Sequence, residues 1–147
     1  MEGNITRIWT GRGAINQVLI DFNNDIDVNV RNLKKGLPEA IDIAFDSMFR
    51  KHDDMQPYFN NLYSVLDFVD AYFSAEIIDE VEANKFMSIV SGQLARSESE
   101  LLCYYGLYSK APHNLKEIID NNGLLKNIDG KRIPSDVLNS YDPRAFM

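Results

Sequence analysis

The spacing of apolar residues constrains this chain more than any other feature of its sequence. From Ile15 onward, large apolar side chains recur every three or four positions, and the strict alternation of a half-buried strand is rare. The first series is Ile15, Leu19, Phe22, Ile26, Val30 and Leu33, and similar series follow over residues 38–50, 57–73 and 77–94. This spacing places apolar groups on one face of a helix. The sequence therefore predicts an all-α fold, a single compact domain of about five to six helices.

Glycine, proline and capping residues mark where the predicted helices begin and end. Gly36 and Pro38 separate the first two helices, because glycine is favoured just after a helix and proline in its first turn. Pro57 opens the third helix, which is apolar around so much of its circumference that we expect it to lie centrally. Ser74 is the predicted N-cap of the fourth helix, with Glu76 in its first turn.

The stretch 84–108 joins two apolar helical patterns across a polar break. Ser97 and Glu100 match the spacing of a capping box directly before an apolar run, so we predict a fifth helix with Ser97 as its N-cap. Asn114 predicts the cap of a sixth helix, and Gly123 predicts its end.

The two ends of the chain differ in composition from the helical part. Residues 1–13 contain three glycines and predict an irregular N-terminal arm, in which Trp9, flanked by arginines, is a candidate binding residue for docking to a partner. Residues 129–147 contain few apolar side chains and two prolines, which predicts an extended C-terminal tail. Residues 14–128 form the predicted helical domain between them.

Composition limits the partners that such a domain can have. The 147 residues include 22 acidic and 15 basic side chains, a formal net charge of −7, which disfavours general nucleic-acid binding. One Trp, seven Tyr and eight Phe are ample for a packed core. Cys103, the single cysteine, is expected to be a small buried hydrophobic residue. The sequence shows neither a signal peptide nor an apolar stretch long enough to span a membrane. We therefore expect a cytoplasmic protein that does not cross a membrane.

No pattern of side chains in the sequence predicts a catalytic centre. Zinc sites need several closely spaced His or Cys ligands, whereas this chain has only Cys103, His52 and His113. Asp67 and Asp70 share a helix face, but solvation of a surface explains that pair. We therefore predict no catalytic residue, no metal ion and no cofactor, and we favour a non-enzymatic role.

Three segments resemble the conserved part of the putative phage abortive infection proteins, a bacterial family of AbiC-like sequences. These segments lie within residues 58–69, 89–107 and 115–128, in the family's order, and residues 19–26 resemble its upstream helix more weakly. Many members resemble membrane-anchored proteins at their N-termini. The resemblance thus implies that this chain is a soluble version without the anchor.

The resemblance also supplies candidate binding residues. The chain departs from the family's polar pattern at Asn60, Ser91 and Tyr105. The residues that match and are carried over are Tyr58, Tyr63, Gln93, Glu98, Tyr104, Lys126 and Asn127. A structural explanation exists for two of them, since Gln93 would face a helix junction and Glu98 would stabilise a helix start through the helix dipole.

The resemblance implies a component of a bacterial antiphage, or abortive infection, defence system. The missing catalytic patterns favour a non-enzymatic helical subunit or regulator that binds a protein partner of the same system or forms a homo-oligomer. The alternative is an RNA-cleaving or metal-dependent toxin effector of such a system.

Overall fold

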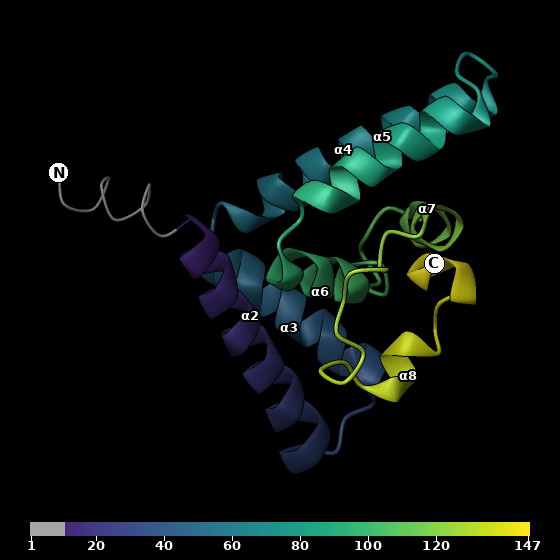
Figure 1. The fold of residues 1–147 in the computed structure, drawn as a ribbon. Coiled ribbons are helices and arrows are strands. Elements are labelled where there is room, and N and C mark those ends of the chain that lie inside the picture. Colours follow the sequence, from purple (N-terminus) through teal and green to yellow (C-terminus); the bar gives the residue numbers. More distant parts are fainter. Residues whose placement is uncertain (1–10) are drawn as a thin grey trace, which may run out of the picture.

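The computed structural model describes residues 11–147, with side chains from Ala14 onward, and confirms the all-α prediction (Figure 1). Its elements in chain order are α2 (Gly11–Asp27), the π-helical turn η1 (Val28–Asn32), α3 (Leu37–Lys51), α4 (Met55–Ser74), α5 (Glu80–Gln93), α6 (Arg96–Tyr105), α7 (Leu115–Asn122), α8 (Ser135–Leu138) and the 3₁₀ helix η2 (Pro143–Phe146). No strand occurs between Gly11 and Met147. None of these helices is both long and apolar enough to cross a bilayer.

Helix α6 lies in the middle of the fold. Every residue from Ser99 to Tyr105 is buried, with α2 and α3 on one side and α7 and the C-terminal segment on the other (Figure 1). Phe45 of α3 contacts the rings of Phe22 and Tyr105, with centroids 4.7 and 5.4 Å apart. Cys103 is buried as predicted, and burial raises the pKa of its thiol to about 12. Clustered aromatic rings on α2, α3, α4 and α6 thus form the centre of the core.

The first described helix differs from the prediction at both ends. It begins at Gly11, within the segment 1–13 expected to be an irregular arm, and the remainder of that segment, including Trp9, lies outside the described residues. Near its other end, the π-helical turn η1 changes the helical period. Val30 is therefore partly exposed rather than buried, and Asn29 is buried instead, with its Nδ2 donating to the Asp25 carbonyl at 2.8 Å.

Helices α4 and α5 form an antiparallel hairpin that projects from the rest of the fold (Figure 1). The prediction that Ser74 caps the fourth helix is wrong, because α4 continues through Ser74 and Asp79 caps α5. Asp79 accepts a hydrogen bond from the Glu82 backbone N–H at 2.8 Å, and the Glu82 carboxylate accepts one from the Asp79 N–H at 3.2 Å. This reciprocal capping box satisfies two N–H groups, whereas a cap at Ser74 would satisfy one.

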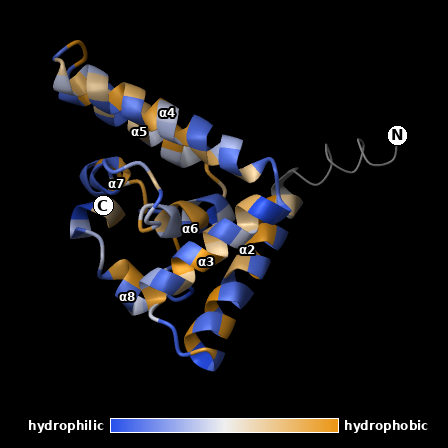
Figure 2. Ribbon diagram, turned by 180° about the vertical axis from the view of Figure 1, so that it is seen from behind, coloured by the Kyte–Doolittle hydropathy of each residue, from blue (hydrophilic) through white to orange (hydrophobic). Residues whose placement is uncertain are grey.

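Only part of α4 is central. Phe59, Leu66 and Val69 are buried, but Phe68 and Tyr72 are exposed. Hydrophobic segments continue along the hairpin as far as its turn (Figure 2). The apolar stripe on α4 is therefore broader than the area that residues 11–147 cover, and the expectation that the whole helix lies centrally is wrong.

The cap of α6 lies two residues before the predicted position. The helix begins at Arg96, and the Glu98 carboxylate accepts the Ala95 N–H at 2.5 Å. Ser97 and Glu100, the predicted capping pair, are both buried. Glutamates two residues apart both lie close enough to the break to cap it, and only Glu98 is free to do so because α6 turns Glu100 toward the core.

The C-terminal segment forms a tail without long helices, but it is packed against the domain rather than extended. Val137, Tyr141 and Ala145 are buried. The Leu125 N–H donates to the Ala145 carbonyl at 2.8 Å, and the Tyr141 hydroxyl donates to the Cys103 carbonyl of α6 at 2.5 Å. Two short helical turns thus bring enough apolar side chains inward to complete the core.

Candidate functional site

A shallow groove of about 340 Å³ lies between α4, α5 and the start of α6. Its lining residues are Tyr58, Asn61, Leu62, Val65, Val90, Gln93, Leu94 and Glu98. Three of the predicted binding residues, Tyr58, Gln93 and Glu98, come together here from three different helices. The groove is therefore where the structure gathers the largest share of the predicted set.

Glu98 connects the base of the hairpin to α6. The Tyr58 hydroxyl donates to Glu98 Oε1 at 3.1 Å, while Glu98 Oε2 accepts the backbone N–H of Ala95. Burial, and then the negative charge of Glu98, raise the pKa of Tyr58 well above its usual value. Tyr58 is thus a neutral donor that positions Glu98, and it is unsuited to act as a base.

A second hydrogen-bonded chain connects α4 to α7. The Tyr63 hydroxyl donates to Asn114 Oδ1 at 2.6 Å, and Asn114 Nδ2 donates to the Asp67 carboxylate at 2.9 Å. Asn114 precedes the first residue of α7, as predicted, but its side chain makes no capping hydrogen bond because it bonds to α4 instead. Tyr63 therefore holds the two helices together rather than facing the groove.

The other predicted residues lie apart from the groove. Tyr104 is buried against Phe22, with ring centroids 4.9 Å apart. Lys126 and Asn127 are exposed in the turn after α7, where Lys126 lines a separate depression beside the C-terminal segment. Trp9 is not among the described residues. The predicted set thus divides into groove, core and turn residues.

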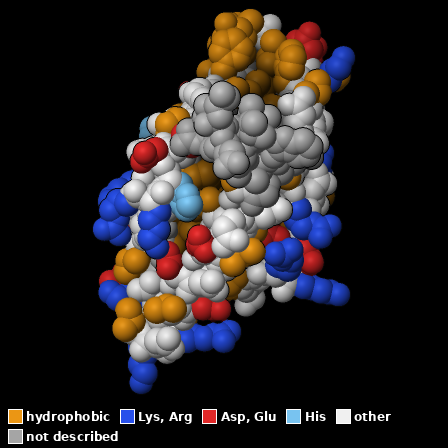
Figure 3. All heavy atoms as spheres, turned by 90° about the vertical axis from the view of Figure 1, so that its left-hand side faces the viewer, with side chains coloured by type: hydrophobic (Ala, Val, Ile, Leu, Met, Phe, Trp, Pro, Cys, Tyr) orange, Lys and Arg blue, Asp and Glu red, His pale blue; other side chains and the backbone are white. Residues whose placement is uncertain are grey.

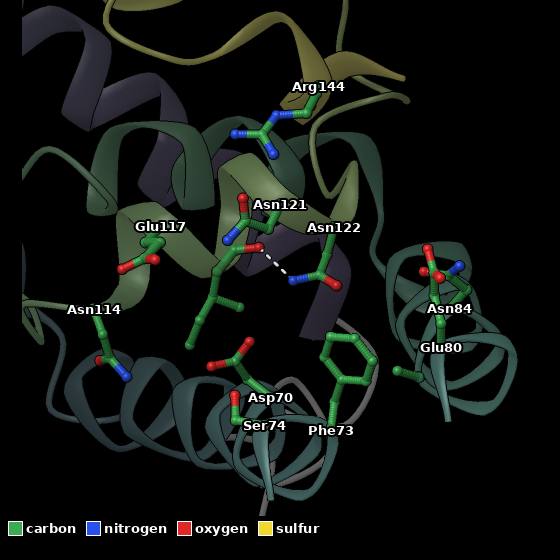
Figure 4. A pocket seen from close by; sticks show the side chains of 12 residues that line it. Asp70, Phe73, Ser74, Glu80, Asn84, Asn114, Glu117, Asn121, Asn122 and Arg144 are labelled. Carbon is green, nitrogen blue, oxygen red and sulfur yellow. Dashed lines mark hydrogen bonds between the residues drawn. The ribbon is translucent and has the colours of Figure 1, made fainter. Parts of the chain in front are cut away.

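A polar cleft of about 420 Å³ lies on the other side of α4, between α4, α5 and α7 (Figure 4). Its lining residues are Asp70, Phe73, Ser74, Glu80, Ala83, Asn84, Asn114, Glu117, Ile118, Asn121, Asn122 and Arg144. Asp70 points from α4 toward α7, which presents Glu117 and Asn121, and Arg144 lies at the far edge (Figure 4). Sequence reasoning took Asp70 for a solvated surface residue. The spacing of Asp67 and Asp70, three residues apart on one helix face, was the one feature of the sequence that could have pointed to this cleft.

The electrostatics of the cleft favour a positively charged or hydrogen-bonding group. Burial raises the pKa of Asp70, and the nearby charges of Asp67 and Glu117 raise it further. Arg144 offers little neutralisation, because its Nε lies 3.0 Å from Asp142. From Gly11 onward, no three His, Cys, Asp or Glu side chains are placed to share a metal ion. The arrangement can therefore hold a polar ligand.

Glu100 is the most unusual carboxylate outside the cleft. Its side chain is only 2% exposed, and its Oε1 has no hydrogen-bond partner, although Arg132 Nε lies 3.4 Å away as an ion pair. That separation and orientation give charge attraction without a hydrogen bond. Burial raises the pKa of Glu100 more than Arg132 lowers it. Glu100 is thus a buried ion-pair contact between α6 and the C-terminal segment that leaves one carboxylate oxygen without a hydrogen bond.

Comparison with known proteins identifies the family. The model of the family described as putative phage abortive infection protein matches residues 50–133, which include the hairpin, α6, α7 and most of both site linings. The weaker resemblance of residues 19–26 lies outside the matched range. Searches of curated proteins and of solved structures found no match. Because the family model covers more than half of the sequence, this chain belongs to the family of putative phage abortive infection proteins.

Proposed function

We propose that this chain is a non-enzymatic, cytoplasmic component of bacterial phage defence that acts by binding a protein partner. The observation that carries this proposal is the α4–α5 hairpin, which exposes large apolar side chains, among them Val65 in the groove and Phe68 one turn further along α4. Figure 3 shows hydrophobic side chains gathered at the top of the molecule, where the hairpin lies. Contiguous exposed apolar surface is typical of protein interaction sites.

Two further features support binding over catalysis. The site linings contain carboxylates, amides and tyrosines, and the acid that is best placed in the groove, Glu98, is occupied by the Tyr58 hydroxyl and the Ala95 N–H. The Tyr58 hydroxyl itself stays protonated, because its pKa is raised. These groups hold helices in place, so a binding surface is the better explanation for the groove.

Phage challenge of cells that carry the complete defence locus tests the proposal. We expect Phe68→Ser, at an exposed hairpin position, to abolish protection and to prevent co-purification of the protein encoded beside this one. Val81→Ser is the matched control, because Val81 is exposed on the same hairpin but lies about 180° around α5 from the groove residue Val90. Protection that survives Phe68→Ser would contradict the proposal.

The toxin alternative predicts a different outcome. Under this alternative, the purified chain cleaves RNA in the presence of a divalent metal ion, and Asp70→Asn or Glu98→Ala abolishes the cleavage. That result would favour a catalytic role over partner binding. We expect no cleavage, because from Gly11 onward no three His, Cys, Asp or Glu side chains are placed to share a metal ion, and Glu98 already accepts hydrogen bonds from Tyr58 and Ala95.

A further inference from the structure

Five exposed apolar residues of the hairpin lie in the groove or close to it along α4 and α5. We call this set the hairpin face, and it consists of Val65 (49% exposed), Phe68 (56%), Tyr72 (37%), Phe86 (47%) and Ile89 (49%). Phe68 and Tyr72 pack on each other, with ring centroids 4.1 Å apart. The hairpin face is therefore apolar, and the part of the chain that the structure describes leaves it largely exposed.

Helical spacing places these residues on one side. Val65, Phe68 and Tyr72 follow the i, i+3, i+7 pattern along α4. On α5, Phe86 and Ile89 lie one turn before Val90 and Gln93, which line the groove. Because α4 and α5 are antiparallel neighbours, the groove and the hairpin face form one apolar trough between two helices. Such a trough is the shape that a third helix fills.

The charge of the hairpin specifies what kind of helix fits. Residues 55–95 contain six acidic side chains and one lysine. Asp70 and Glu80 line the polar cleft, and Asp67 accepts a hydrogen bond from Asn114, so these three acids do not face the trough. Glu82 lies one turn before Phe86 on α5, near the hairpin turn, and Glu98 lies at the opposite end of the trough. A second copy of this chain would bring a second acidic hairpin against the first. A helix with basic residues would meet opposite charge at both ends.

We infer that the trough binds an amphipathic α-helix of a partner protein, with an apolar stripe flanked by Lys and Arg. This inference rests on the proposed function and specifies the chemistry of its partner. The 14 residues of α5 correspond to a helix of about 21 Å, so the partner segment needs roughly four turns to fill the trough. Its apolar stripe contacts Phe68 and Phe86, and its basic residues face Glu82 and Glu98.

Two synthetic 18-residue peptides test this inference with the full chain. Both carry leucines at i, i+3, i+4 and i+7 spacing; one has lysines on the flanking positions and the other has glutamates. We expect fluorescence anisotropy to show at least tenfold tighter binding of the lysine peptide at low salt, with the difference shrinking as salt increases. Equal affinity for the two peptides would overturn the charge argument.

Variants locate the binding to the trough. Phe68→Ser and Phe86→Ser should each weaken binding of the lysine peptide at least tenfold. Val81→Ser should leave it unchanged, although Val81 is 75% exposed, because a step of five residues turns Val81 about 140° away from Phe86 on the helix. An equal loss in Val81→Ser would overturn the inference, as would dimerisation in sedimentation experiments that Phe68→Ser abolishes.

The peptide and phage experiments can fail separately. If the lysine peptide binds as expected but Phe68→Ser still protects cells, the trough is a helix-binding site and the proposed role in defence is wrong. If Phe68→Ser loses protection but neither peptide binds, the partner binds through something other than a basic helix, and this inference is wrong.

Discussion

The surroundings of α6 and the α4–α5 hairpin both contain many large apolar residues, but these residues are buried around α6 and partly exposed on the hairpin. Around α6, apolar side chains from several other segments cover every residue from Ser99 to Tyr105. On the hairpin, the same kinds of residue stay partly exposed, and the nearby polar groups form two hydrogen-bonded links to α6 and α7. Apolar content alone therefore does not distinguish a core from a binding surface. The number of helices and other segments that pack against a region distinguishes the two.

The largest effect that separates the two regions is expected at Phe45. It contacts five other aromatic rings in the core, and Phe45→Ala would leave a cavity among them. We expect a loss of about 3–5 kcal/mol in the free energy of unfolding, measured by urea denaturation. A loss below about 1 kcal/mol would mean that the aromatic cluster is not the centre of the core.

Glycine replacements provide a matched test between the regions. A Cβ at Gly106 would lie 2.2 Å from the Tyr141 hydroxyl and 2.9 Å from Ile119 Cδ1, whereas one at Gly92 of α5 would meet nothing within 4 Å. Gly106→Ala should therefore destabilise the chain by about 1–3 kcal/mol. Gly92→Ala should stabilise it by up to about 1 kcal/mol, because alanine favours a helix. Thermal unfolding of both variants checks this, and equal shifts would contradict it.

Glu100 should give the core a distinctive pH dependence. Its pKa in the folded chain is raised above the ordinary value of 4.5, so the folded chain binds this proton more tightly than the unfolded chain does. Stability from this group is therefore fully present below pH 4.5 and is lost as the pH rises through the raised pKa. Glu100→Gln should remove that loss, so that urea denaturation shows a smaller decrease in stability between pH 4 and 7.

Asp46 provides the control of opposite sign. The Tyr108 hydroxyl, followed by Lys110, holds the pKa of Asp46 below its ordinary value, so its contribution is lost as the pH falls. Asp46→Asn should therefore reduce stability at neutral pH more than at acidic pH. If both variants changed the pH profile in the same direction, burial would not be the cause of the behaviour of Glu100.

The smallest effect on folding is expected at the hairpin face. Phe68 is more than half exposed, and its substitution by serine removes little buried area. We expect Phe68→Ser to change the free energy of unfolding by about 0.5 kcal/mol or less, while it removes partner binding. A large destabilisation would show that the hairpin face is part of the core, and would remove the contrast with α6.

The helices themselves were predictable because helical periodicity is a local property. Their caps were harder, since Ser74 and Asp79 both begin plausible patterns, and Glu98 and Glu100 lie two residues apart before the same apolar run. Periodicity also cannot say whether another element covers an apolar stripe. Phe68 therefore counted as core from the sequence, although it is exposed.

The sites were predictable only in part. Tyr58, Gln93 and Glu98 were selected by family resemblance, and they do converge on one groove. The polar cleft was missed because its lining comes from α4, α5, α7 and the C-terminal segment, far apart in the sequence. Asp70 and Arg144, for example, are brought to one cleft only by the packing of the tail, which the sequence suggested to be extended.

The hydrogen bonds of α4 leave that helix supported at one end only. The side-chain hydrogen bonds of Tyr58, Tyr63 and Asp67 to other helices all lie before the last two turns of α4. The polar cleft lies between those last two turns and α7. About 10 Å of α4 extends beyond Asp67 to the hairpin turn. Force applied at the turn would thus act on the starts of α6 and α7 as well as on the buried side chains of Val69, Ala83 and Met87.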